Sequence, residues 1–192
     1  MLVTLNLPSP KLELLTYVEK KLNDFVFTER KLSWCQQVYG KNNLYADYEY
    51  YTDETIVTLI KNQFQKHFSF SINNVFLILM NSHDRQPRVM PPHTDKLRMT
   101  AINFYTRLGG NSTNFILYDK YGLNDINNSD LLRYDQLRVQ SKHNLKEETW
   151  YGFNSKQFHS IENVTSKRLC IGLFFAEPFD QFLEVHNNLL IL

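Results

Sequence analysis

The sequence has few of the features that mark secreted, membrane-spanning or disulfide-rich proteins. It contains two cysteines, Cys35 and Cys170, and they do not form the closely spaced pair of a metal-binding motif. No apolar stretch approaches the roughly 20 residues that a membrane-spanning helix requires, and no charged-then-apolar leader opens the chain. We therefore expect a cytoplasmic protein with no membrane partner, in a compartment that keeps thiols reduced.

An excess of charge of either sign is also missing. The 192 residues include 21 lysines and arginines against 20 aspartates and glutamates, which gives a net charge of +1. Nucleic-acid-binding proteins usually carry a basic surface, so nucleic acid is not an expected partner. Hydrophobic residues make up 43% of the chain, a share typical of a globular fold. The length predicts a single domain over residues 1–192.

Two amphipathic helices are predicted in the first third of the chain. Ser9 and Pro10 are typical of a helix N-cap and first helical position. The apolar residues that follow recur at helical spacing and predict one buried face: Leu12, Leu15, Val18 and Leu22. A second helix is expected from Thr52-Asp53 onward, with a buried stripe at Ile56, Ile60 and Phe64.

From residue 75 onward the sequence consists of short apolar or alternating segments separated by turns. The expected strands are residues 75–79, 99–105, 114–118, 132–139, 149–153, 158–164 and 168–176. Gly109-Gly110 marks a turn, an Asn-rich loop is expected at 124–130, and a final helix in 179–192. Helices followed by many strands favour a mainly β fold with flanking helices, a cupin-like jelly roll or double-stranded β-helix. Residues 1–70 would form a largely helical buttress and residues 75–176 the β-helix core.

A histidine and an aspartate two residues apart, His93 and Asp95, are the first candidates for a chemical site. In a strand or its exit, residues two apart point to the same side, so both can reach one ion. His159, at the start of a later predicted strand, offers a third ligand. Two histidines and one carboxylate on one face of a metal leave the opposite positions open, as in non-haem iron(II) oxygenases. A surface histidine beside a solvated aspartate is the alternative.

A cation follows the third candidate ligand. The strand that begins near His159 leads through a turn to Arg168, which opens the apolar segment 169–175. A hairpin between these strands would bring Arg168 back beside His159. Its planar guanidinium is suited to bidentate capture of a carboxylate.

In this order, His93-x-Asp95, His159 and Arg168 resemble the 2-oxoglutarate/iron(II) dioxygenase superfamily, on its prolyl-4-hydroxylase-like side. The resemblance covers residues 75–176. It implies a double-stranded β-helix in which the first three residues hold Fe(II) and Arg168 binds 2-oxoglutarate. Dioxygen is the second co-substrate, and ascorbate is allowed as a further cofactor. The implied reaction hydroxylates a small molecule or a peptide, including its prolyl residues, with release of succinate and CO2.

Some positions depart from the pattern of many relatives. Lysine is usual among prolyl hydroxylases where Arg168 lies, and Cys170 replaces a serine two positions later. A tyrosine that often precedes the His-x-Asp triplet is missing. Asn103 and Tyr105, on the strand after the triplet, would contact the co-substrate if they face inward, and ordinary strand positions are the alternative.

The other histidines, and the arginines near the triplet, are expected at the surface. His67 and His186 would be partly exposed on helices, His83 would lie in a polar loop, and His143 in a hydrophilic turn. Three arginines are expected as solvated rim residues, with an acidic substrate as the alternative partner: Arg85, Arg88 and Arg98.

Other functions stay open at this point. The same fold and metal can oxidise a nucleobase or a small metabolite. A cupin-like barrel can also bind a metal or a ligand without catalysis, and a structural protein can carry the triplet by accident. The sequence carries no signal for the oligomeric state.

Overall fold

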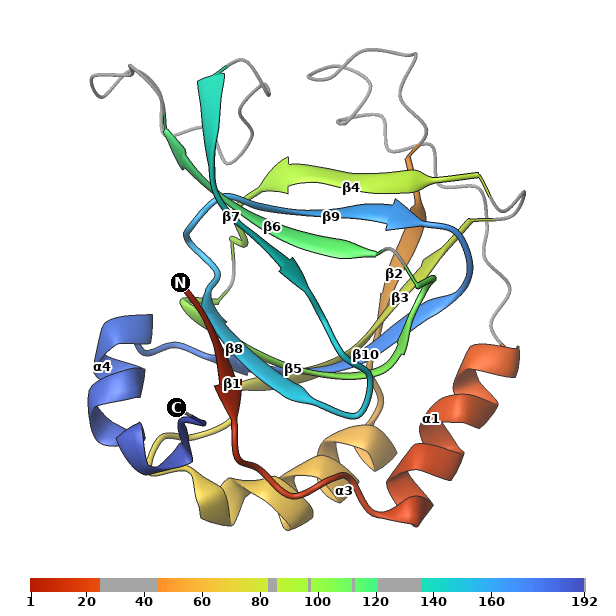
Figure 1. Ribbon diagram of the computed structural model, residues 1–192. Helices are drawn as coiled ribbons and strands as arrows, with labels where there is room; N and C mark the ends of the chain where they lie inside the picture. The colour runs from red at the N-terminus through yellow and green to blue at the C-terminus, as the bar shows by residue number, and fades with distance from the viewer. Residues whose placement is uncertain (25–44, 83–85, 97, 112, 121–135, 192) are drawn as a thin grey trace.

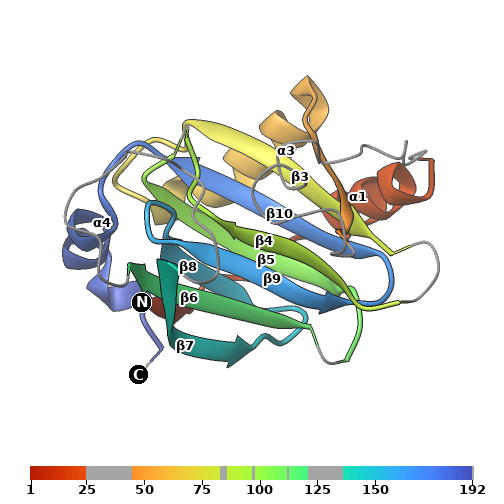
Figure 2. The ribbon, with the colours of Figure 1, turned by 90° about the horizontal axis from the view of Figure 1, so that it is seen from above.

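The computed structural model describes residues 1–24, 45–82, 86–96, 98–111, 113–120 and 136–191. Its strands form two antiparallel sheets that face each other (Figure 1). The large sheet has the order β1 (Leu2–Leu5), β8 (Trp150–Asn154), β5 (Thr100–Leu108), β10 (Arg168–Phe175), β3 (Asn74–Asn81) and β2 (Asp47–Tyr51). The small sheet has the order β4 (Arg88–His93), β9 (His159–Val164), β6 (Asn114–Lys120) and β7 (Leu137–Asn144). Seen from above, the small sheet lies over the large one (Figure 2).

The strands from β3 to β10 pass back and forth between the two sheets. β3, β5, β8 and β10 belong to the large sheet, and β4, β6, β7 and β9 to the small sheet. Each group of four pairs out of sequence order, as β8-β5-β10-β3 and as β4-β9-β6-β7. This interleaving is that of a jelly roll. The prediction of a mainly β, jelly-roll fold is confirmed.

Two helices, α1 (Leu12–Asp24) and α3 (Glu54–Phe64), lie below the large sheet in Figure 1. Side chains alternate along β10, and Leu169, Ile171 and Leu173 pack in one core with both helices. The opposite side of β10 turns Arg168 and Cys170 toward the pocket between the sheets. The large sheet therefore separates an apolar core from a polar pocket.

The first helix begins later than the sequence predicted, and the predicted buried face is confirmed except at Leu12. The α-helix starts at Leu12. Before it, the side chain of Gln63 accepts from the N–H of Lys11 and donates to the carbonyl of Ser9, which ties this segment to α3. Leu12 is 79% exposed. Val18 and Leu22 are buried as predicted, Leu15 packs partly buried against the core, and Leu14 takes the place expected for Leu12.

The second helix agrees with the prediction. Asp53 is its N-cap, and Oδ1 accepts a hydrogen bond of 2.8 Å from the N–H of Ile56. The predicted stripe of Ile56, Ile60 and Phe64 is fully buried. Asp53 Oδ2 also accepts from the hydroxyls of Tyr17 and Tyr51, each at 2.6 Å, which ties α1 and β2 to the start of α3.

Three strands were not predicted, and two of them come from the N-terminal segment. Residues 1–70, expected to be a largely helical buttress, also supply β1 and β2 to the large sheet. β4 escaped prediction because it contains Pro91-Pro92, and proline cannot donate to a strand ladder. Its place at the edge of the small sheet makes those prolines acceptable.

Strand β7 differs from its prediction as well. The predicted segment 132–139 lies partly outside the described residues, as does the whole expected loop at 124–130. The strand starts at Leu137 and runs to Asn144, so His143 is a strand residue and not part of a turn. Its side chain pairs with Ser141 on the same strand at 2.8 Å.

The chain ends in a short helix, α4 (Phe179–Val185), followed by a 3-10 turn at Asn187–Leu189. His186, predicted to be partly exposed, is 3% exposed. Its Nε2 accepts from the N–H of Ser69 at 2.9 Å, and its Nδ1 pairs with the carbonyl of Phe182. His186 therefore links Ser69 to helix α4 from a buried position. No helix in the described part of the chain combines the length and the apolar character needed to cross a membrane.

Candidate metal centre

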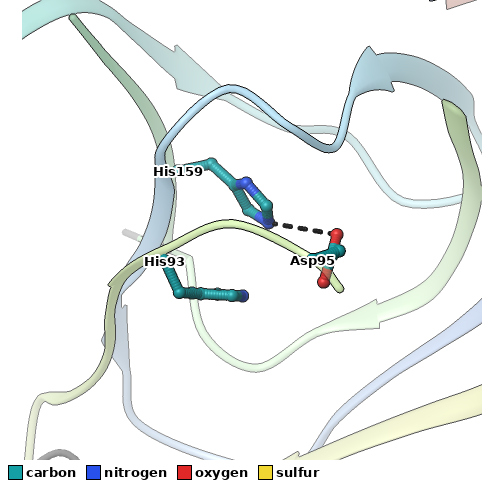
Figure 3. Close-up of side chains that lie close together, drawn as sticks. All are labelled: His93, Asp95 and His159. Atoms are coloured by element: carbon teal, nitrogen blue, oxygen red, sulfur yellow. Dashed lines mark ion pairs between the residues drawn. The ribbon is translucent and has the colours of Figure 1, made fainter. Parts of the chain in front are cut away.

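The structure brings together the three side chains that the sequence marked as ligands. β4 pairs with β9 so that His93, the last residue of β4, lies opposite His159, the first residue of β9. The two ring centroids are 4.4 Å apart. Asp95 follows β4 directly, and its Oδ2 lies 3.7 Å from His159 Nε2 (Figure 3). One ligand atom of each residue lies within 4.8 Å of the others, a separation that one ion can bridge.

Both histidines are held in the same tautomer. His93 Nδ1 lies 2.8 Å from the carbonyl of Pro91, and His159 Nδ1 lies 2.9 Å from the carbonyl of Gln157. A carbonyl oxygen only accepts, so each Nδ1 must carry the proton and donate. The lone pair is then on Nε2, which faces the cluster. Backbone contacts of this kind orient histidine ligands in metal proteins.

The protonation states are those that metal binding requires. Burial, and then the neighbouring His93, lowers the pKa of His159 to about 3. Burial also lowers the pKa of His93. For Asp95, burial favours the neutral acid, but the guanidinium of Arg98 and the two neighbouring histidines together outweigh this effect and hold the pKa below its ordinary value. At neutral pH the cluster consists of two neutral imidazoles and one carboxylate.

A buried serine fixes the segment that carries Asp95. The N–H of Asp95 donates to the carbonyl of Ser155 at 2.9 Å, and the N–H of Ser155 donates to the carbonyl of Met99. The Ser155 hydroxyl donates to the carbonyl of Arg98 at 2.7 Å, and the residue is fully buried. Ser155 therefore clamps the chain between Asp95 and Met99. It lies in the turn after β8, and no motif in the sequence singled it out.

A pocket between the two sheets reaches both histidines. Its described lining residues are Tyr48, Tyr50, Ile78, Met80, Met90, His93, Arg98, Asn103, Tyr105, Phe115, Phe153, His159, Ile161, Arg168 and Cys170. The rings of Phe115 and Phe153 lie 5.6 and 5.0 Å from that of His159 and restrict its movement. The three residues predicted to contact a co-substrate all line this pocket.

Arg168 lines the pocket and is 1% exposed. Its Cζ lies 4.5 Å from the ring centroid of Tyr105, and Nη1 donates to the carbonyl of Leu108 at 3.1 Å. Nη2 is buried and has no hydrogen-bond partner among the residues that the structure describes. Gly109, with a φ of 84°, makes room for it, because a Cβ there would lie 2.8 Å from the Arg168 Cβ.

Asn103 and Tyr105 face inward from β5. Asn103 Nδ2 donates to the Tyr105 hydroxyl at 3.2 Å, while Asn103 Oδ1 is buried without a partner in the described part of the chain. Burial raises the pKa of Tyr105, which keeps its hydroxyl neutral. Burial also raises the pKa of Cys170 to about 11, so this residue presents a thiol and not a thiolate.

Arg98, expected as a solvated rim residue, is instead 5% exposed and belongs to the centre. Its Nε donates to Asp95 Oδ2 at 2.6 Å. In the sequence, Asp95 and Arg98 are an acid and a base three residues apart. This spacing did not indicate that the pair would be buried. Of the other loop residues considered above, His83 and Arg85 lie outside the described residues.

Comparisons with known proteins give distant similarities only. No family model matches the chain, and no curated protein matches it. A solved prolyl-4-hydroxylase from Pseudomonas putida is 10% identical with a TM-score of 0.47, over 92% of each chain. The E. coli ycfD structure is 12% identical with a TM-score of 0.43, over 68% of this chain. This chain spans only 32% of the ycfD chain. The jelly-roll assignment rests on the strand order described above.

Proposed function

We propose that the chain is an iron(II)- and 2-oxoglutarate-dependent oxygenase in which His93, Asp95 and His159 hold the metal. The observation that carries the proposal is the convergence of two neutral imidazoles and one carboxylate on a pocket that also contains an incompletely paired arginine. The alternative is a cupin-like module that would bind the metal but would not catalyse the reaction. An assay for both metal and co-substrate separates the two functions.

The donor set fits iron(II). Two nitrogen donors and one oxygen donor on one side of an ion leave the remaining coordination positions open for co-substrates. When bound, iron(II) with 2-oxoglutarate and dioxygen supplies the oxidising power for hydroxylation of a C–H bond, with release of succinate and CO2. His93 and His159 contribute Nε2, and Asp95 offsets part of the metal charge. Zinc uses similar ligands, so the experiment below includes it.

Arg168 is the proposed partner of the distal carboxylate of 2-oxoglutarate. Burial of a charged donor without a hydrogen-bond partner costs free energy. A carboxylate oxygen that accepts from Nη2 would remove that cost. The Tyr105 ring holds the guanidinium plane, and the Leu108 carbonyl holds its other nitrogen. Asn103 and Tyr105 are proposed as further polar contacts to the co-substrate. The proposed substrate is a small molecule or a residue in a peptide, prolyl residues included.

The test is spectroscopic and is made without dioxygen. Protein loaded with Fe(II) should develop a visible charge-transfer band when 2-oxoglutarate is added, and admission of air should then release succinate. Zn(II)-loaded protein should show neither. His159→Ala should lose the band, while the matched control His143→Ala, on strand β7 outside the pocket, should keep it. Iron binding without a band or succinate would favour a metal-binding module and contradict the oxygenase.

A further inference from the structure

Arg98 places a second buried guanidinium in the metal pocket, beside the one assigned to 2-oxoglutarate. Its Nε donates to Asp95 Oδ2 at 2.6 Å, and its Cζ lies 3.9 Å from the ring centroid of Phe174. The ring of Phe153 lies further away, at 5.8 Å. One edge and one face of the guanidinium are thus occupied, and these contacts fix its plane.

A free donor remains on Arg98. Nη1 is buried and has no hydrogen-bond partner within the part of the chain that the structure describes. Buried charged donors are nearly always paired, because leaving one unpaired costs more free energy than leaving a neutral group unpaired. Arg98 lines the same pocket as His93, His159 and Arg168. The unmet donor therefore points to an acceptor that enters this pocket from outside.

The charge balance of the pocket favours an anion as that acceptor. Among the described lining residues, Arg98 and Arg168 are the formally charged ones, and the adjoining cluster adds Asp95. Two guanidinium groups and a divalent iron carry four positive charges, while Asp95 and the 2-oxoglutarate dianion carry three negative charges. One positive charge remains beside two buried guanidinium groups, where the effective dielectric constant is lower than in bulk water.

We infer that Arg98 receives a carboxylate of the substrate, so that the enzyme acts on carboxylic acids. The inference rests on the proposed function, which supplies the iron and the co-substrate in the charge balance. Arg98 donates to Asp95 through Nε. A substrate carboxylate that accepts from Nη1 of the same guanidinium would therefore lie close to a proposed metal ligand. Arg98 would thus be a specificity-determining residue as well as a neighbour of the metal.

The first experiment identifies the source of the carboxylate. The Kd of 2-oxoglutarate is measured without dioxygen in Fe(II)-loaded wild type, Arg98→Gln and Arg168→Leu. We expect Arg168→Leu to raise this Kd at least tenfold and Arg98→Gln to change it less than threefold. An equal rise in Arg98→Gln would assign Arg98 to the co-substrate's own carboxylate and overturn the inference.

The second experiment measures selectivity for acids. Zn(II)-loaded protein with 2-oxoglutarate, which cannot turn over, is screened by thermal unfolding against short mono- and dicarboxylic acids, the amino acids and the primary amide of each compound. Wild type should bind at least one acid tenfold more tightly than its amide. Arg98→Gln should lose this preference, Arg98→Lys should keep part of it, and the surface control Arg107→Gln should keep all of it.

Other outcomes of the acid screen contradict the inference. If no acid in the set binds wild type, or if acids and amides bind equally, Arg98 does not select a carboxylate. If Arg98→Gln weakens metal binding but keeps the preference for acids, Arg98 only positions Asp95. Absence of the Fe(II)–2-oxoglutarate band in wild type would defeat the proposed function alone. Acid binding would still be scored, because the Zn(II) screen is also run without 2-oxoglutarate.

Discussion

Asp95 and Ser155 are joined by a backbone hydrogen bond of 2.9 Å that fixes the start of the loop after β4. The Ser155 side chain holds the other end of this loop through the carbonyl of Arg98. The position of the one carboxylate in the proposed metal site thus depends on a residue from a distant part of the sequence. Preorganisation of this kind lowers the cost of bringing ligands together around an ion.

Ser155→Ala should weaken both folding and metal binding. Loss of a buried hydrogen bond costs about 1 kcal/mol, and the freed loop should lower Fe(II) affinity severalfold. Denaturant unfolding and iron titration measure the two effects. Ser141→Ala on β7 is the control, because its partner His143 lies outside the pocket. An unchanged iron affinity in Ser155→Ala would show that the loop keeps its position without the clamp.

Arg168→Leu should separate co-substrate binding from metal binding. Charge-assisted hydrogen bonds to a carboxylate contribute roughly 1.5–3 kcal/mol, so the Kd of 2-oxoglutarate should rise about 10- to 100-fold. Iron affinity should change little, since Arg168 is not a ligand. Both constants can be measured by anaerobic titration. Collapse of iron binding in this variant would mean that Arg168 supports the metal site and not the co-substrate.

The metal-free protein should lose stability as the solution becomes acidic. The pKa of His159 is about 3 in the folded protein, against an ordinary value of 6.5. Between these values the unfolded chain binds a proton that the folded protein does not, so the free energy of unfolding rises with pH. His159 should contribute a slope of up to about 1.4 kcal/mol per pH unit in this window. His159→Gln should show a smaller slope in denaturant unfolding at pH 4 to 6.5, and an unchanged slope would argue against a neutral, buried His159.

Two leucines of α1 test which face of this helix is buried. Leu14 is 1% exposed and Leu12 is 79% exposed. Leu14→Ala should lower the free energy of unfolding by about 2–5 kcal/mol, because it leaves a cavity in the core. Leu12→Ala should change it by less than about 0.5 kcal/mol. A larger loss of stability in Leu12→Ala than in Leu14→Ala would place Leu12 on the buried face, as the sequence spacing predicted.

The sequence was most informative where local chemistry and tertiary structure agree. The stripe of Ile56, Ile60 and Phe64 obeys helical periodicity, and the core faces the side that this periodicity selects. Residues 75–80 of β3 and 169–175 of β10 form apolar runs, so the type of these strands could be predicted without knowledge of their neighbours. The His-x-Asp spacing of His93 and Asp95, together with His159 further along the chain, identified the three residues of the cluster. The fold brings them close enough together to bind one ion.

The features that escaped prediction depend on contacts between distant segments. β4 contains two prolines, and only its place at a sheet edge explains how they are accommodated. From the sequence alone Arg98 was expected at the surface, but in the structure Asp95 and Phe174 enclose it. His186 is buried because Ser69 and Phe182 supply both of its partners. Local spacing contains no information on any of these contacts.

The most direct measurement is the iron stoichiometry of the wild type and of three single variants. Equilibrium dialysis under anaerobic conditions should give one Fe(II) per wild-type chain. His93→Ala, Asp95→Ala and His159→Ala should each lower the affinity by at least about 100-fold, since each removes one of three ligands, and His143→Ala should match wild type. Retention of wild-type affinity in any one of the three ligand variants, with the fold intact by circular dichroism, would contradict a metal centre built from these residues.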